Sequence, residues 1–130
     1  MPGADDQTRT IAELTAQVRH FVQERDWDQY HLPKDLALAL SIEAAEVLEH
    51  FRFRSDAEVA ARLQDDTHVE EIGHELADVL YFVLLMYHRL GLDVAKTLDG
   101  KLAISARRYP VDKARGRNLK YTELNAIEPK

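Results

Sequence analysis

Two segments of the sequence are apolar on nearly every side of a helix, and this feature constrains the fold most. They run from about Lys34 to Phe53, containing LALALSIEAAEVLEHF, and from Thr67 to Leu90, containing HELADVLYFVLLMY. A helix without a polar side must be covered by other elements. Because strand signals are nearly absent from the chain, those elements are expected to be helices, and the fold is expected to be all-α.

Capping signals and terminators predict a four-helix-type bundle with one extra short helix. A capping box Thr10–Glu13 is predicted to open a helix that ends near Trp27, and a capping box Ser55–Glu58 a short helix that ends near Leu63. A capping box Thr67–Glu70 is predicted to open the long segment that ends at Gly91. Asp93 is predicted to cap a further helix that stops before Pro110. Beyond Pro110 the chain is expected to be irregular. Its 130 residues are expected to form one domain, 1–130.

Charge and composition exclude several classes of protein. The chain has no cysteine, which excludes disulfides, iron–sulfur clusters, thiolate zinc sites and cysteine nucleophiles. Its net charge of −6 argues against a general nucleic-acid binder. The basic residues gather in residues 101–120, which hold seven basic groups and one acid. Such a segment can bind phosphates, and the alternative is a solvated basic tail.

The hydropathy pattern predicts a soluble, cytoplasmic protein that does not interact with membranes. The longest nearly apolar run, Leu76–Tyr87, contains Asp78 and is shorter than the ~20 residues that a membrane span needs. The first nine residues contain no apolar core of a signal peptide.

Two pairs of acids interrupt the apolar segments. Glu43 and Glu46 are three residues apart in one segment, and Glu75 and Asp78 are three residues apart in the other. Each pair shares one face of its helix, with Cβ atoms about 5–6 Å apart. Unpaired carboxylates in apolar surroundings lose hydration and repel each other, so a shared cation is expected. Oxygen ligands favour Mg²⁺, with Mn²⁺ as a substitute.

The two pairs are also expected to meet. Glu43 lies ten residues before Phe53 and Glu75 lies eight residues after Thr67, or ~15 and ~12 Å along their helices. Antiparallel packing would place all four acids at about the same height. The alternative is that the acids face solvent or pair with lysine and arginine, as in a helical interaction module without enzymatic activity.

Other residues allow more than one interpretation. The spacing of Glu71 and His74 is that of half a di-iron site, as in a di-metal redox bundle, but the sequence contains no second half-site. Glu71 could also be an additional ligand or a solvated acid. Trp27, Tyr30 and His31 cluster at a predicted helix end, where they could stack on a base or close the end of the bundle.

With EAAE at 43–46 and ELAD at 75–78, separated by 28 residues, the sequence resembles the MazG-like nucleotide pyrophosphohydrolases. It is most similar to their dCTP pyrophosphatase branch. The resemblance runs from about Ile11 to Leu124. It includes the stretches ERDWDQYHLP, LALALSIEAAE, ELADVL, RRYP and KYTEL.

This resemblance implies an all-α dimer or tetramer that cleaves nucleoside triphosphates, dCTP or a modified deoxynucleotide among them, to monophosphate and pyrophosphate. It implies that the catalytic Mg²⁺ ligands are Glu43, Glu46, Glu75 and Asp78. It also implies that the substrate is contacted by Trp27, His31, Phe53, Phe82, Lys101, Ser105, Arg108 and Tyr109. Ser105 stands where the family has asparagine, and Phe53 stands where the family typically has tryptophan. Both positions are expected to contact the substrate, so these two differences are expected to affect the base preference.

Overall fold

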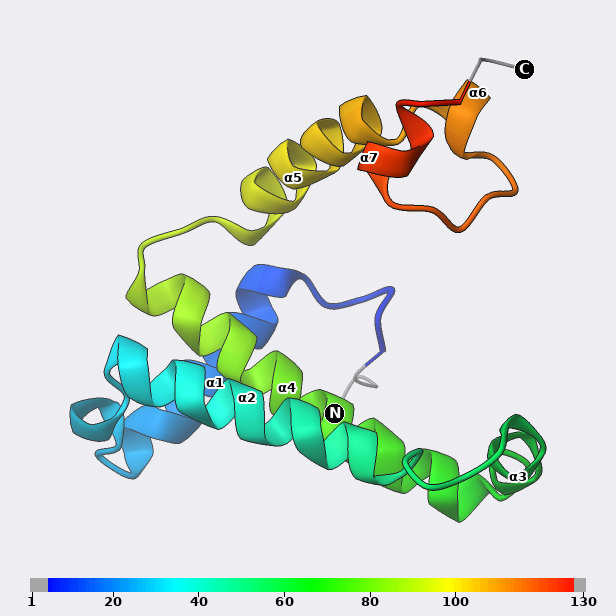
Figure 1. Cartoon of the computed structure of the whole chain (residues 1–130). Helices are drawn as coiled ribbons and strands as arrows, with labels where there is room; N and C mark the ends of the chain where they lie inside the picture. The colour runs from blue at the N-terminus through cyan, green and yellow to red at the C-terminus, as the bar shows by residue number, and fades with distance from the viewer. Residues whose placement is uncertain (1–4, 128–130) are drawn as a thin grey trace. The chain divides into compact units, whose positions relative to one another are not determined.

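The computed structural model describes residues 5–127, which contain helices, turns and loops but no strand. The all-α prediction is therefore confirmed. The chain divides into two compact units, one up to Leu92 and one from Asp93 (Figure 1). The expectation of one domain over residues 1–130 stays a prediction.

The first unit is built on two long antiparallel helices. Its elements are α1 (Ile11–Glu24), the 3₁₀ helix η1 (Asp28–Tyr30), α2 (Pro33–Glu49), α3 (Asp56–Arg62) and α4 (Asp66–Arg89). Helices α2 and α4 lie side by side along most of their length, and α1 packs against α4 (Figure 1). The short α3 lies in the connection between α2 and α4. Because this connection reverses the chain, the end of α2 faces the start of α4.

The core of this unit lies where α1, α2 and α4 meet. Val22, Leu36 and Leu85 are buried there, one from each helix. Partly buried side chains pack around them: Val18, Tyr81, Phe82 and Met86. Burying an aliphatic side chain contributes about 1.5–3 kcal/mol to folding. This packing fixes the register of α2 against α4 and therefore the height of the acids that they carry.

Three of the four predicted caps are confirmed, and one is wrong. Thr10 and Ser55 form capping boxes, and the Asp93 carboxylate accepts the N–H of Lys96 at 2.8 Å. Helix α4, however, is capped by Asp65, whose carboxylate accepts the N–H of Thr67 at 3.0 Å. Aspartate caps a helix at least as well as threonine, so the helix begins earlier and includes Thr67 in its first turn.

The first two predicted helices end earlier than expected. Helix α1 stops at Glu24 instead of near Trp27, and α2 stops at Glu49 instead of near Phe53. In each case a residue with positive φ follows: Asp26 at 55° and Phe53 at 62°. A left-handed residue cannot continue a right-handed helix, so these two positions turn the chain.

The second unit contains α5 (Val94–Arg108), α6 (Val111–Ala114) and α7 (Tyr121–Leu124). The expectation of irregular structure beyond Pro110 is therefore wrong for α6 and α7. Leu124 is almost fully buried, and the Tyr121 ring lies 6.1 Å from the Tyr109 ring. Helices of four residues are too short to show a periodic apolar pattern, which explains why the sequence did not reveal them. Within residues 5–127, none of the helices has the length and apolar character of a membrane span.

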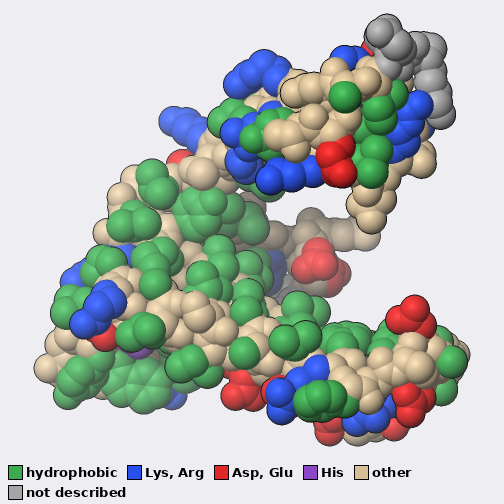
Figure 2. Space-filling model, viewed as in Figure 1, with side chains coloured by type: hydrophobic (Ala, Val, Ile, Leu, Met, Phe, Trp, Pro, Cys, Tyr) green, Lys and Arg blue, Asp and Glu red, His purple; other side chains and the backbone are tan. Residues whose placement is uncertain are grey.

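Apolar side chains remain exposed on both long helices of the first unit. Leu38 and Ile42 lie one turn apart on α2, and Leu76 and Leu80 lie one turn apart on α4; between 44% and 59% of each is exposed. Figure 2 shows hydrophobic side chains on much of the visible surface of this unit. By itself, the first unit therefore leaves exposed the apolar faces that the sequence predicted.

We expect a homo-oligomer, a dimer or a tetramer, because association would remove these side chains from water. Light scattering at micromolar concentration should give a mass of at least twice 14.9 kDa. Leu76→Lys should lower that mass, whereas Gln64→Lys, the same charge at an exposed polar position, should not. A wild-type mass near 14.9 kDa would contradict the prediction.

Candidate active site

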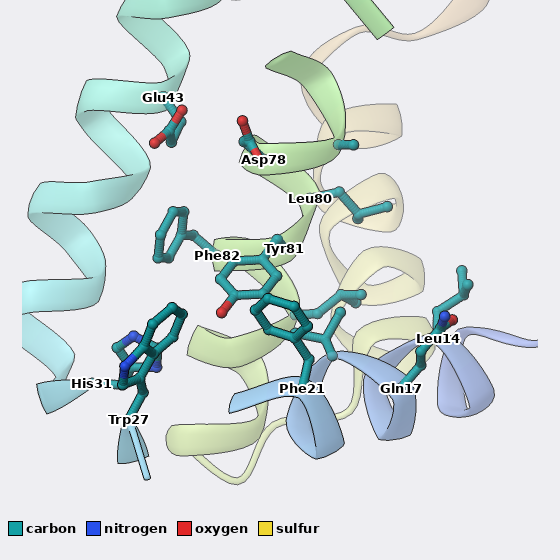
Figure 3. A pocket seen from close by; sticks show the side chains of 13 residues that line it. Leu14, Gln17, Phe21, Trp27, His31, Glu43, Asp78, Leu80, Tyr81 and Phe82 are labelled. Carbon is teal, nitrogen blue, oxygen red and sulfur yellow. The ribbon is translucent and has the colours of Figure 1, made fainter. Parts of the chain in front are cut away.

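Three of the four predicted acids converge between the two long helices. Glu43 projects from α2, and Glu75 and Asp78 project from α4. One carboxylate oxygen of each lies within 4.8 Å of the other two. Glu43 and Glu75 are half-buried and Asp78 is exposed. Figure 3 shows Glu43 and Asp78 pointing toward each other from the two helices.

The electrostatics of this group are unfavourable without a cation. The pKa of Glu43 is raised, first by burial and then by the negative charges of Asp78, Glu46 and Glu75. Within residues 5–92, none of these four acids forms an ion pair with a basic side chain. The alternative in which they pair with lysine or arginine therefore does not hold within the first unit.

Glu46 lies beside the group but outside its closest contacts. It is exposed on α2, one turn after Glu43, and its charge contributes to the raised pKa of Glu43. Its oxygens are not among those within 4.8 Å of one another. It therefore offers a carboxylate at the edge of the group.

A cavity of about 620 Å³ adjoins the acids, with Glu43 and Asp78 in its wall (Figure 3). Its aromatic lining consists of Phe21, Trp27, Tyr81 and Phe82. Neighbouring rings make edge-to-face contacts. The distance between ring centroids is 6.0 Å for Phe21 and Trp27, 6.2 Å for Phe21 and Tyr81, and 4.9 Å for Tyr81 and Phe82. This is the size and lining of a small-molecule site.

His31 also lines the cavity and carries an unsatisfied polar atom. Its Nδ1 is buried and has no hydrogen-bond partner within residues 5–127. Its ring makes an edge-to-face contact with Phe82 at 6.4 Å. Leaving a buried polar atom unpaired costs about 1–3 kcal/mol, so this atom is suited to a hydrogen bond from a ligand.

The remaining predicted substrate residues belong to the turn after α2 and to the second unit. Phe53 is 92% exposed and does not line the cavity; the Arg52 guanidinium lies 4.8 Å above its ring. The others belong to the second unit, on α5 or directly after it: Lys101, Ser105, Arg108 and Tyr109. Arg108 lies over the ring of Tyr121 at 5.0 Å. The roles assigned to all of them in substrate binding stay predictions.

Sequence reasoning did not single out two aromatic residues of the cavity. Phe21 lies on α1 and Tyr81 on α4, each among the apolar residues of its helix. An aromatic residue on an apolar stripe gives no signal that distinguishes a cavity wall from a packed core. Their T-shaped contact becomes visible only when α1 is placed against α4.

The di-iron interpretation finds no support in the placement of Glu71. Its carboxylate groups with His50 and His68 and is not part of the group formed by Glu43, Glu75 and Asp78.

Comparison with known proteins places the chain in a family. The MazG-like family profile matches residues 38–124. The chain belongs to the MazG-like family. Two curated relatives named dCTP pyrophosphatase 1, from Rattus norvegicus and Homo sapiens, are each 34% identical to it over 115 residues, which cover 88% of this chain and 68% of theirs. The crystal structure of a pyrophosphatase from Archaeoglobus fulgidus has a TM-score of 0.68 and 33% identity; the match covers 83% of this chain and 99% of that one.

The carboxylate group predicts that Mg²⁺ stabilises the fold. Because the ion binds the folded state, unfolding should shift to higher temperature, with a gain of about 2.7 kcal/mol when Mg²⁺ is about 100 times its Kd. Thermal melts with and without Mg²⁺ measure this gain. Glu75→Gln should remove most of it, whereas Glu70→Gln, an exposed acid on the same helix, should retain it. Equal gains in both variants would contradict a metal site at Glu75.

Proposed function

We propose that the chain hydrolyses a nucleoside triphosphate, dCTP or a modified deoxynucleoside triphosphate, to monophosphate and pyrophosphate, and so clears such nucleotides from the cellular pool. The observation that carries the proposal is the carboxylate group of Glu43, Glu75 and Asp78, two of which, Glu43 and Asp78, lie in the wall of an aromatic cavity. Membership of the MazG-like family and relatives named dCTP pyrophosphatase 1 support it.

The chemistry of the acids fits Mg²⁺, with Mn²⁺ as a substitute. The donors are carboxylate oxygens only, which suits a hard divalent cation. The charges that raise the pKa of Glu43 would be offset by the ion. We assign Glu43, Glu46, Glu75 and Asp78 as its ligands and catalytic residues. When bound, Mg²⁺ would offset the negative charge on the phosphate oxygens.

The attack on the α-phosphorus requires a base for the incoming water. A carboxylate has two oxygens, so a glutamate of this group can accept the proton on the oxygen that does not hold the ion. Glu46 suits this role because it lies beside Glu43 but outside the closest contacts. The displaced group is pyrophosphate, which leaves in line with the attacking oxygen.

The cavity suits the base of the nucleotide. Trp27 and Phe82 offer aromatic faces or edges, and stacking on an aromatic side chain is worth about 1–3 kcal/mol per base. The unpaired Nδ1 of His31 can hydrogen-bond to a polar atom on the edge of the base. Phe53, in the exposed turn after α2, is proposed as a further stacking residue.

The basic second unit suits the phosphates. Lys101 and Arg108 are exposed on α5, and both belong to the segment 101–120, which holds seven basic groups and one acid. We propose that they hold the leaving pyrophosphate and that Ser105 and Tyr109 complete this side of the substrate site. Charge-assisted hydrogen bonds of this kind are about twice as strong as neutral ones.

Substitution of a metal ligand should change activity and apo stability in opposite directions. Glu43→Gln keeps the shape of the side chain but removes a charge, so pyrophosphate release should nearly disappear. Because the pKa of Glu43 is raised in the fold, its ionised form is disfavoured there, and the neutral amide should raise the melting temperature without metal. Pyrophosphate release and melts without Mg²⁺ measure the two effects.

Glu49→Gln is the matched control, because Glu49 is exposed on the same helix and pairs with Arg52 at 2.9 Å. It should leave turnover unchanged and should not raise the apo melting temperature. Asp78→Asn combined with Glu43→Gln should lose little more than either single variant, because the site is already broken. Near-native turnover of Glu43→Gln at modest Mg²⁺ would contradict the proposal.

Removal of the only tryptophan tests the cavity as the base site. Trp27→Ala should raise KM for the preferred nucleotide by about 5- to 150-fold, since stacking is worth about 1–3 kcal/mol. KM should change less for nucleotides with poorly accepted bases. Steady-state kinetics over a panel of nucleoside triphosphates measure this. If only thermal stability falls while base preference is unchanged, Trp27 merely closes the end of the helices.

A further inference from the structure

A second group of metal-ligand side chains lies where α2 ends and α4 begins. His50 follows the last residue of α2, and His68 and Glu71 lie in the first two turns of α4. One ligand atom from each lies within 4.8 Å of the other two. We propose that these three residues form a separate site for a transition-metal ion of the zinc class.

The spacing of the ligand atoms is close to that of a zinc site. Nδ1 of His68 lies 3.6 Å from Oε2 of Glu71. Two ligands at zinc-bond lengths are about 3.3–3.6 Å apart in a tetrahedron. The rings of His50 and His68 are 5.1 Å apart. A small movement of the half-buried His50 would complete three protein ligands and leave the fourth position to water.

The ligand types select a different metal from the one proposed at the carboxylate group. Two imidazole nitrogens and one carboxylate oxygen suit Zn²⁺, Co²⁺ or Ni²⁺, whereas Mg²⁺ prefers oxygen ligands alone. His68 is only 7% exposed, so one ligand is held in place by its surroundings. Glu71 is largely exposed and gives the ion access to solvent.

Arg62 competes with the ion for this site. Its Nη2 lies 3.3 Å from Nδ1 of His68, the atom that also faces Glu71. A cavity of about 220 Å³ lies here, lined by Arg62, Asp65, Thr67, His68 and Glu71. A bound ion would replace the guanidinium as the positively charged partner of His68. Removal of the guanidinium should therefore strengthen metal binding.

Metal binding here would join the end of α2 to the start of α4. The intervening connection contains α3 and spans the chain from His50 to His68. An ion that binds the folded state only would stabilise this turn of the chain. The two helices that it joins are those that carry Glu43, Glu75 and Asp78, so their packing would be reinforced from one end.

Zn²⁺ titration of the full chain by calorimetry, in millimolar Mg²⁺, tests the proposal. One Zn²⁺ per chain should bind and raise the melting temperature. His50→Ala and Glu71→Gln should each weaken Zn²⁺ binding at least tenfold. Arg62→Met should strengthen it several-fold, because it removes the competing cation while keeping most of the side-chain stem. His50 and Glu71 are not deeply buried, so these variants should fold even if substitution of His68 does not.

Two controls separate this site from other histidines and from the carboxylate group. His20→Ala removes an exposed histidine that pairs with Glu24 at 3.2 Å and should leave Zn²⁺ binding unchanged. Glu75→Gln, which should impair the proposed hydrolysis, should also leave it unchanged. The proposal is overturned if the wild type binds no Zn²⁺, if His50→Ala binds as the wild type does, or if Glu75→Gln is the variant that loses binding.

Discussion

The register between α2 and α4 is the constraint on which the rest of the site depends. Packing of Leu36 against Leu85 at one end of the helix pair fixes how the helices lie against each other. Because each residue advances a helix by ~1.5 Å, the same register brings Glu43 opposite Glu75 and Asp78. Apolar burial therefore holds like charges together, which explains the raised pKa of Glu43 and the need for a cation.

The same packing joins the carboxylates to the cavity. Tyr81 and Phe82 lie three and four residues after Asp78 on α4 and contact each other, while Phe21 on α1 contacts Tyr81. Helix α4 thus carries acids on one turn and aromatic rings on the next. A triphosphate bound through the metal would have its base within reach of these rings. The proposed metal ligands and the proposed base pocket therefore both include residues of α4.

The sequence allowed prediction of those parts of the structure that depend on local pattern. Helical periodicity and capping boxes predicted the helices of the first unit, and counting residues from the turn predicted the meeting of Glu43, Glu75 and Asp78. The features that the sequence did not predict depend on competition between caps or on tertiary packing. Asp65, and not Thr67, caps α4. Leu124 is buried in α7, which is too short to show the apolar periodicity of a helix. Phe21 and Tyr81 were indistinguishable from core residues until the helices were placed together.

We propose that this carboxylate group directs water to the α-phosphorus of a nucleoside triphosphate. Hydrolysis of dCTP in ¹⁸O-labelled water with Mg²⁺, followed by mass analysis of the products, tests it most directly. The account predicts one ¹⁸O atom in the monophosphate, unlabelled pyrophosphate and no release of orthophosphate. Label in pyrophosphate would place the attack on the β-phosphorus, and release of orthophosphate would place bond cleavage at the γ-phosphate; either result would contradict the account.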